Sequence, residues 1–115
     1  MKKILIIRFS SIGDIVLTTP VVRCLKKQTG LEVHYLTKQA FQPVLAANPY
    51  IDKVWTFRKE VTEVLPQLRA EGFDLVIDLH RNLRSLRVRL TLWRVRSYAF
   101  NKLNFEKWLM VNWKI

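Results

Sequence analysis

The sequence predicts an α/β domain of Rossmann-like type, a parallel sheet of five strands flanked by helices. Five short apolar runs alternate with segments of helical periodicity. Two of these runs, residues 4–7 and 75–79, lack polar alternation, as strands buried on both faces of a parallel sheet do. The length of 115 residues suffices for one domain with a core and is too short for two. Right-handed crossovers then favour the strand order 3-2-1-4-5, which makes strands one and four neighbours.

The first half of the chain supplies three of these strands. After the strand at residues 4–7, a helix is expected over 14–28, with Ser10 or Ser11 as its cap and Gly30 as its left-handed end. Pro20 is expected to kink or restart this helix, because proline removes a backbone donor. Strands are expected at 32–37 and 53–57, with a short helix over 38–47 between them.

The second half begins with apolar residues at helical spacing, namely Val61, Val64, Leu65 and Leu68. Pro66 suits this helix only if it begins near Glu63. A strand at 75–79 follows, and then a helix whose packing face is expected to consist of Leu83, Leu86, Leu90 and Trp93. A fifth strand at 95–100 and an amphipathic helix at 105–113 complete the expected order.

Composition restricts the classes of protein. Half of the residues are apolar, no apolar run approaches the roughly 20 residues that a membrane-spanning helix needs, and the N-terminus lacks the pattern of a signal peptide. The single cysteine, Cys24, excludes an internal disulfide and fits a reducing compartment. We therefore expect a cytoplasmic protein. The isolated His34 and His80 give no metal-ligand cluster, so no metal is expected.

Positive charge is concentrated in the last third of the chain. Residues 1–80 carry 11 basic and 8 acidic side chains, whereas residues 81–115 carry 9 and 1, within a total net charge of +11. This asymmetry predicts an anionic partner: a phosphorylated glycolipid, a membrane surface or nucleic acid.

The first strand runs directly into small residues and then into a helix. This arrangement places a ligand at the carboxyl end of the strand, where the helix N-terminus offers free N–H groups. Asp14 would project from the first turn beside that crevice. The macrodipole alone also favours an acidic residue there, and serine is a common cap without any function. The segment has one glycine and no G-x-G-x-x-G spacing, so it is not a dinucleotide fingerprint.

Residues 7–20, IRFSSIGDIVLTTP, resemble the opening motif of glycosyltransferase family 9, the lipopolysaccharide heptosyltransferases. Residues 73–85, FDLVIDLHRNLRS, are similar to a second signature of that family. Two matches in the right order are more specific than either alone. The resemblance covers nearly the whole chain but only about the first third of a typical member.

The resemblance implies a GT-B enzyme with two Rossmann-like domains, of which residues 1–115 would form the N-terminal, acceptor-side domain. The C-terminal nucleotide-sugar domain would be absent, and the chain alone is expected to be inactive. The implied reaction is inverting transfer of a heptose from an ADP-sugar to a lipopolysaccharide core acceptor, with no cofactor and no metal. A peripheral position on the inner face of the cytoplasmic membrane fits such an acceptor.

The family's base position falls on Asp14, and the expected acceptor-binding residues are Ser10, Ser11, Gly13, His80, Asn82 and Arg84. Each also has a purely structural interpretation. Asp78 can cap local N–H groups, and His80 can pack against the neighbouring loop.

Two other functions remain open from the residues. Six arginines between positions 81 and 96, with Trp93 and Tyr98 for stacking, suit an arginine-rich nucleic-acid-binding domain. No RNA-binding signature accompanies them, so we expect no specific nucleic acid. A regulatory α/β domain could use Asp14 and Asp78 as a carboxylate pair, but the sequence offers no identifiable Thr or Lys partner for it.

Overall fold

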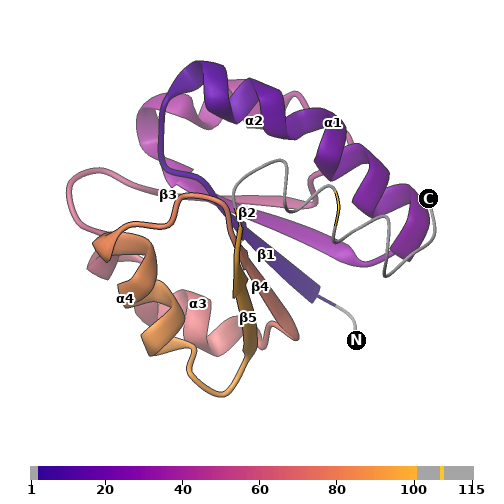
Figure 1. Cartoon of the computed structure of the whole chain (residues 1–115). Coiled ribbons are helices and arrows are strands. Elements are labelled where there is room, and N and C mark those ends of the chain that lie inside the picture. The colour runs from indigo at the N-terminus through magenta and orange to yellow at the C-terminus, as the bar shows by residue number, and fades with distance from the viewer. Residues whose placement is uncertain (1–2, 101–106, 108–115) are drawn as a thin grey trace.

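The computed structural model describes residues 3–100 and Lys107. Its centre is a parallel sheet of five strands, which are β1 (Lys3–Ile7), β2 (Glu32–Lys38), β3 (Lys53–Phe57), β4 (Leu75–Asp78) and β5 (Arg96–Ala99). Their order is β3-β2-β1-β4-β5, as predicted (Figure 1). The helix expected over 105–113 lies outside the described residues, Lys107 apart.

Helices cover both faces of the sheet (Figure 1). One face carries α1 (Ile12–Thr29) and α2 (Gln42–Ala46), the second preceded by a 3₁₀ turn over Gln39–Phe41. The other face carries α3 (Leu65–Glu71) and α4 (Leu83–Thr91), and a 3₁₀ turn over Val61–Glu63 precedes α3. Among the described residues, no helix combines the length and the apolarity needed to cross a membrane.

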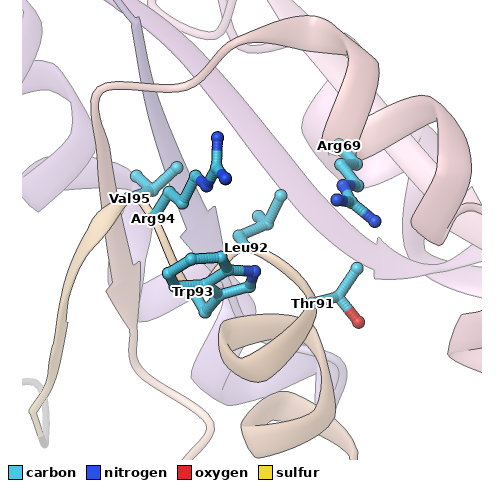
Figure 2. Close-up of a pocket in the computed structure, with 6 residues that line it drawn as sticks. All are labelled: Arg69, Thr91, Leu92, Trp93, Arg94 and Val95. Carbon is cyan, nitrogen blue, oxygen red and sulfur yellow. The ribbon is translucent and has the colours of Figure 1, made fainter.

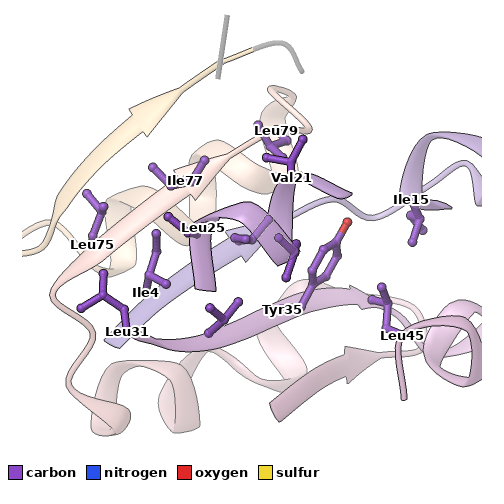
Figure 3. Close-up of a cluster of buried hydrophobic side chains, with 13 residues drawn as sticks. Ile4, Ile15, Val21, Leu25, Leu31, Tyr35, Leu45, Leu75, Ile77 and Leu79 are labelled. Atoms are coloured by element: carbon purple, nitrogen blue, oxygen red, sulfur yellow. The ribbon is translucent and has the colours of Figure 1, made fainter. Parts of the chain in front are cut away.

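Each face of the sheet has its own buried core, because alternate side chains of a strand point to opposite faces. Ile4 and Ile6 belong to the core beneath α1 and α2, and Figure 3 shows it. Leu5 and Ile7 belong to the core beneath α3 and α4. All four side chains are fully buried, so β1 is a central strand, as its unbroken apolar run predicts.

Pro20 does not interrupt α1, so the expected restart of the helix is wrong. The helix runs from Ile12 to Thr29 and ends at Gly30, which has a φ of 67°. Proline has no N–H for the carbonyl four residues earlier, which here is that of Val16. The hydroxyl of Thr19 donates to this carbonyl oxygen at 2.7 Å instead. The helix thus keeps a donor for the carbonyl group that the proline leaves unpaired.

The expected packing face of α4 is also wrong. Leu83, Leu86 and Leu90 are exposed, and Trp93 is exposed beyond the end of the helix. The helix buries Ser85 and Val88 against the sheet instead. Both sets have helical spacing, so periodicity alone could not decide between them. The larger leucine face therefore lies on the outside of the molecule.

Thr18 and Tyr35 form a buried polar contact between α1 and β2. The Thr18 hydroxyl lies 2.6 Å from the carbonyl oxygen of Ile15 and 2.8 Å from the Tyr35 hydroxyl. Since the threonine proton goes to the carbonyl oxygen, the tyrosine is the donor in the second bond. Burial raises the pKa of Tyr35 well above its usual range, so the side chain stays neutral.

We expect Thr18→Val to lower the free energy of unfolding by about 1–3 kcal/mol, because the buried Tyr35 hydroxyl loses its acceptor. Chemical denaturation of the 115-residue chain measures this loss. The double variant with Tyr35→Phe removes the stranded hydroxyl and should recover part of the stability. Additive losses in the double variant would contradict the pairing.

Candidate active site

The strand order brings two loops together at the carboxyl edge of the sheet. Strands β1 and β4 are paired in parallel, with Ile7 opposite Asp78. The amide of Leu79 donates to the carbonyl oxygen of Ile7 at 3.0 Å, which holds the two loops side by side as they leave the sheet. Both segments that resemble family signatures therefore meet at one place, as the predicted strand order requires.

Arg8 joins these loops to the first turn of α1. One guanidinium nitrogen donates to the carbonyl oxygen of Leu79 at 2.8 Å, and another lies 2.9 Å from Oδ2 of Asp14. The Ser11 hydroxyl also donates to this Oδ2, at 2.9 Å. The backbone amide of Ser11 contributes a further hydrogen bond to this carboxylate. The Asp14 side chain is thus held in place by Arg8 and Ser11.

The electrostatics of this group favour a charged carboxylate. The hydrogen bond from Ser11 and the nearby Arg8 guanidinium hold the pKa of Asp14 below its usual range. The side chain of Asp14 is 51% exposed, so a ligand can reach it. Asp14 is therefore an anionic and accessible carboxylate.

Ser11 is the N-cap residue of α1, but its hydroxyl does not cap the helix. It serves Asp14 instead, which the cap interpretation of the sequence did not predict. Ser10 lies half-buried in the preceding loop. Gly13 is exposed in the first turn, and a Cβ built there would meet nothing within 4 Å. The backbone at Gly13 therefore has open space in front of it.

Asp78 has a structural role, as the cap interpretation predicted. It is fully buried, and its Oδ1 accepts the amides of His80 and Arg81 at 2.9 and 2.8 Å. Its Oδ2 accepts Nε of Arg89 at 3.0 Å. Arg81 has a φ of 58°, in the left-handed region that non-glycine residues rarely occupy. The Asp78 carboxylate therefore holds a sharply turned loop in place.

His80 packs against the first loop. Its ring lies 4.7 Å from the ring of Phe9, which itself meets Phe57 edge-on. Burial and the charge of Arg8 lower the pKa of His80, so the ring is neutral at pH 7. Its Nδ1 is buried and has no hydrogen-bond partner in the described part of the chain. The packing role of His80 is thus observed, and its role toward an acceptor stays a prediction.

Asn82 and Arg84 stand at the start of α4. Asn82 caps that helix. Its Oδ1 accepts a hydrogen bond from the backbone amide of Ser85 at 2.9 Å, and its backbone amide donates to the Ser85 hydroxyl at 2.8 Å. Arg84 is exposed and near enough to His80 to contribute to its lowered pKa. A role in acceptor binding stays a prediction for both residues.

Two arginines outside the expected set of site residues support the candidate site. Arg8 contacts Leu79 and Asp14, and its charge contributes to the lowered pKa of His80. Arg89 pairs with the buried Asp78. The position of Arg8, one residue after a central strand, is the only signal that could have identified it.

One cluster outside this edge has ligand-like atoms. Oxygens of Glu32 and Glu71 and a ring nitrogen of His34 lie within 4.8 Å of one another. The indole of Trp55 donates to Nδ1 of His34 at 2.9 Å, which leaves the ring proton on Nε2, facing Glu32. The ammonium group of Lys3 lies 2.9 Å from Glu71. Lysine thus supplies the positive charge here, and the protonated Nε2 is unsuited to a metal ion.

Two curated proteins resemble the chain in sequence. It is 29% identical over 107 residues to lipopolysaccharide heptosyltransferase 1 of Campylobacter coli, across 87% of the chain and 31% of that protein. It is 36% identical over 78 residues to lipopolysaccharide heptosyltransferase 3 of Escherichia coli (strain K12), across 58% and 23%. The chain thus spans a third or less of the length of these relatives. No protein-family model matches it.

Solved structures share the fold. A glycosyltransferase of family 9 from Veillonella parvula superposes with a TM-score of 0.76 at 25% identity, over 92% of this chain and 34% of that one. The E. coli heptosyltransferase WaaC, solved with ADP, superposes with a TM-score of 0.68 at 16% identity, over 84% and 34%. The predicted fold class, a Rossmann-like part of a GT-B glycosyltransferase, is confirmed. In sequence and in fold, the chain resembles heptosyltransferases of glycosyltransferase family 9.

Proposed function

We propose that this chain is the acceptor-side domain of an inverting glycosyltransferase that transfers a heptose from an ADP-sugar to a lipopolysaccharide core acceptor. The observation that carries the proposal is the Asp14 carboxylate, exposed at the meeting point of β1 and β4 and held by Arg8 and Ser11. A carboxylate so placed can take the proton of an acceptor hydroxyl. The likeness to two heptosyltransferases supports the class of reaction.

In the proposed step, the acceptor oxygen attacks the anomeric carbon of the donor from the face opposite the diphosphate. The new C–O bond forms as the bond to the ADP leaving group breaks, and the hydroxyl proton passes to Asp14. General bases of this kind contribute on the order of 10²–10⁴ to the rate. The leaving diphosphate needs cationic or N–H stabilisation, which we assign to a second, donor-binding domain.

The role of Arg8 gives a pH prediction. Because Arg8 and Ser11 lower the pKa of Asp14, the carboxylate should stay charged as the pH falls through the usual aspartate range. The stability that these contacts contribute is present above the unfolded pKa and lost as the pH falls through the lowered one. We expect Arg8→Gln and Ser11→Ala each to move the titration of Asp14 to higher pH, in a carboxyl-detected NMR titration of the chain. An unchanged titration in both variants would contradict the assigned contacts.

The proposed acceptor is a phosphorylated glycolipid at an anionic membrane surface, which the basic second part of the chain would attract. Arg84 and Arg96 are both exposed, but Arg84 opens α4 at the carboxyl edge of the sheet and Arg96 begins β5 at the opposite edge. We expect Arg84→Ala to weaken binding of acceptor-bearing vesicles more than Arg96→Ala does, at near-physiological salt. Vesicle co-sedimentation against mixed nucleic acids as competitors measures this difference.

The same experiment tests the alternative function. Any surface this basic attracts a polyanion at low salt through counterion release, so low-salt binding to nucleic acid does not discriminate. Nucleic-acid binding that is sequence-selective and survives the higher salt would favour an arginine-rich nucleic-acid-binding domain. Equal losses from the two arginine variants would contradict the placement of the acceptor beside Arg84.

A further inference from the structure

We propose that α4 is the element that docks this domain on an anionic lipid bilayer, with its outward leucine stripe (Leu83, Leu86 and Leu90) inserted among the lipids. The inference rests on the proposed function, in which the acceptor is a membrane glycolipid. It names the surface that makes the contact and adds apolar insertion to charge attraction.

The leucine stripe is unusual for a helix that packs on a sheet. Leu83 is 84% exposed and Leu90 is 64% exposed, whereas Ser85 and Val88, on the other side of the helix, are buried. Leucines three and four residues apart form one continuous ridge. A ridge of large apolar side chains in water marks an interaction surface more often than a single exposed leucine does.

Arginines surround the stripe. Arg84 and Arg87 are exposed on α4, and Arg94 follows its end. The sequence has no Asp or Glu between Asp78 and Glu106. The guanidinium carbon of Arg94 lies 4.9 Å from the centre of the exposed Trp93 ring, and Figure 2 shows the pair beside a pocket of about 180 Å³. Leucine, tryptophan and arginine are the residues that interfacial helices present to a membrane.

This combination favours a bilayer over other occupants. A second copy docked through the same face would bring Arg84 and Arg87 against the same arginines of its partner, with like charges opposed. Nucleic acid would use the arginines and leave the leucines in water. An anionic bilayer accommodates both, because head groups attract the arginines and acyl chains receive the leucines.

The stripe adjoins a pocket at the start of α4. This pocket has a volume of about 580 Å³ and includes one of the expected acceptor-binding residues, Asn82; its lining is Arg81, Asn82, Leu83, Leu86, Arg89 and Ala99. With α4 lying on the membrane, this pocket would open next to the lipid surface. A glycolipid head group could then reach the carboxyl edge of the sheet without its acyl chains leaving the bilayer.

The test is co-sedimentation of the 115-residue chain with vesicles of phosphatidylcholine containing phosphatidylglycerol. The test variant is Leu83→Gln with Leu90→Gln, because glutamine keeps helix propensity while removing the apolar surface. The matched control is Val16→Gln with Leu17→Gln, which removes two apolar side chains of 47% and 55% exposure from α1, on the other face of the sheet.

We expect the α4 variant to bind the anionic vesicles at least about tenfold more weakly than wild type does, and the α1 control to bind them as wild type does. Wild type should bind little to vesicles of pure phosphatidylcholine. We also expect wild type to retain part of its binding when salt screens the arginines, since inserted leucines are insensitive to screening. In the absence of lipid, the α4 variant should keep the thermal midpoint of wild type, because its leucines already face solvent.

Several results would overturn the inference. If the α4 variant bound the vesicles as strongly as wild type does, charge alone would hold the domain on the vesicle. A lowered thermal midpoint without lipid would mean that another segment of the chain covers the stripe. If wild type were a dimer in solution and the α4 variant a monomer, the stripe would be an interface with a second copy of the chain. The proposed function would survive each of these, because the effect of Asp14→Asn on turnover of the intact transferase tests it without involving α4.

Discussion

Asp14→Asn should lower kcat of the intact transferase about a hundredfold or more, with acceptor binding little changed. Asparagine has nearly the size of aspartate and can still accept hydrogen bonds from Ser11 and Arg8, so the local structure should persist. It cannot take a proton from the acceptor hydroxyl. A transfer assay at saturating donor and acceptor measures kcat, and isothermal titration with the acceptor measures binding.

Two controls separate chemistry from structure in that experiment. Ser11→Ala keeps the carboxylate and removes the hydrogen bond from the Ser11 hydroxyl, so it should reduce kcat far less than Asp14→Asn does. The thermal midpoint should fall only slightly in Asp14→Asn, because the side chain is half exposed. Near-wild-type turnover by Asp14→Asn would remove this residue from the base position.

Asp78→Ala should cause the largest loss of stability among the substitutions considered, about 3–5 kcal/mol. The variant would leave the Arg89 guanidinium beside a buried site without its counter-charge, and would strip two loop amides of their acceptor. Single domains of this size have a free energy of unfolding of about 5–15 kcal/mol, so this substitution would remove a large part of it. Urea denaturation of the variant and wild type measures the difference.

Asp78→Asn divides this effect into its two parts. Asparagine can still accept the amides of His80 and Arg81 through its oxygen, but it removes the charge that Arg89 pairs with. We expect a smaller loss for Asp78→Asn than for Asp78→Ala. Equal losses would show that the ion pair dominates, and a negligible loss in both would contradict a structural role for this carboxylate.

The fold was predictable because its strands are short and its turns are explicit. The apolar runs that became β1 and β4 have no competing interpretation, and Gly30 and Gly72 end their helices with positive φ values, as glycine allows. The face of α4 was not predictable, because Leu83, Leu86 and Leu90 have the same helical spacing as the residues that pack. The difference lies in contacts with the sheet, and periodicity does not encode those.

The meeting of the two loops was predictable from the sequence, but the contacts between their side chains were not. The loops after β1 and β4 are adjacent because the strand order reverses there, and Asp14 lies beside them because it is in the first turn of α1. That Ser11 would serve Asp14 rather than the helix, and that Arg8 would reach both Leu79 and Asp14, depends on side-chain directions. A strand-end arginine has several partners within reach, and the sequence does not rank them.

The hydrogen bond from Thr19 to the Val16 carbonyl in α1 changes how the first family signature should be interpreted. Within residues 3–100, its Thr-Pro pair, Thr19 and Pro20, makes no hydrogen bond or ion pair with Asp14 or the second loop, and the hydroxyl of Thr19 donates to the Val16 carbonyl. The motif therefore combines two requirements of different origin: the contacts of Asp14 with Arg8 and Ser11, and a helix that must continue through a proline. Under the proposed role of Asp14, a relative that keeps the Thr-Pro pair but lacks the carboxylate would retain the helix and lack the base.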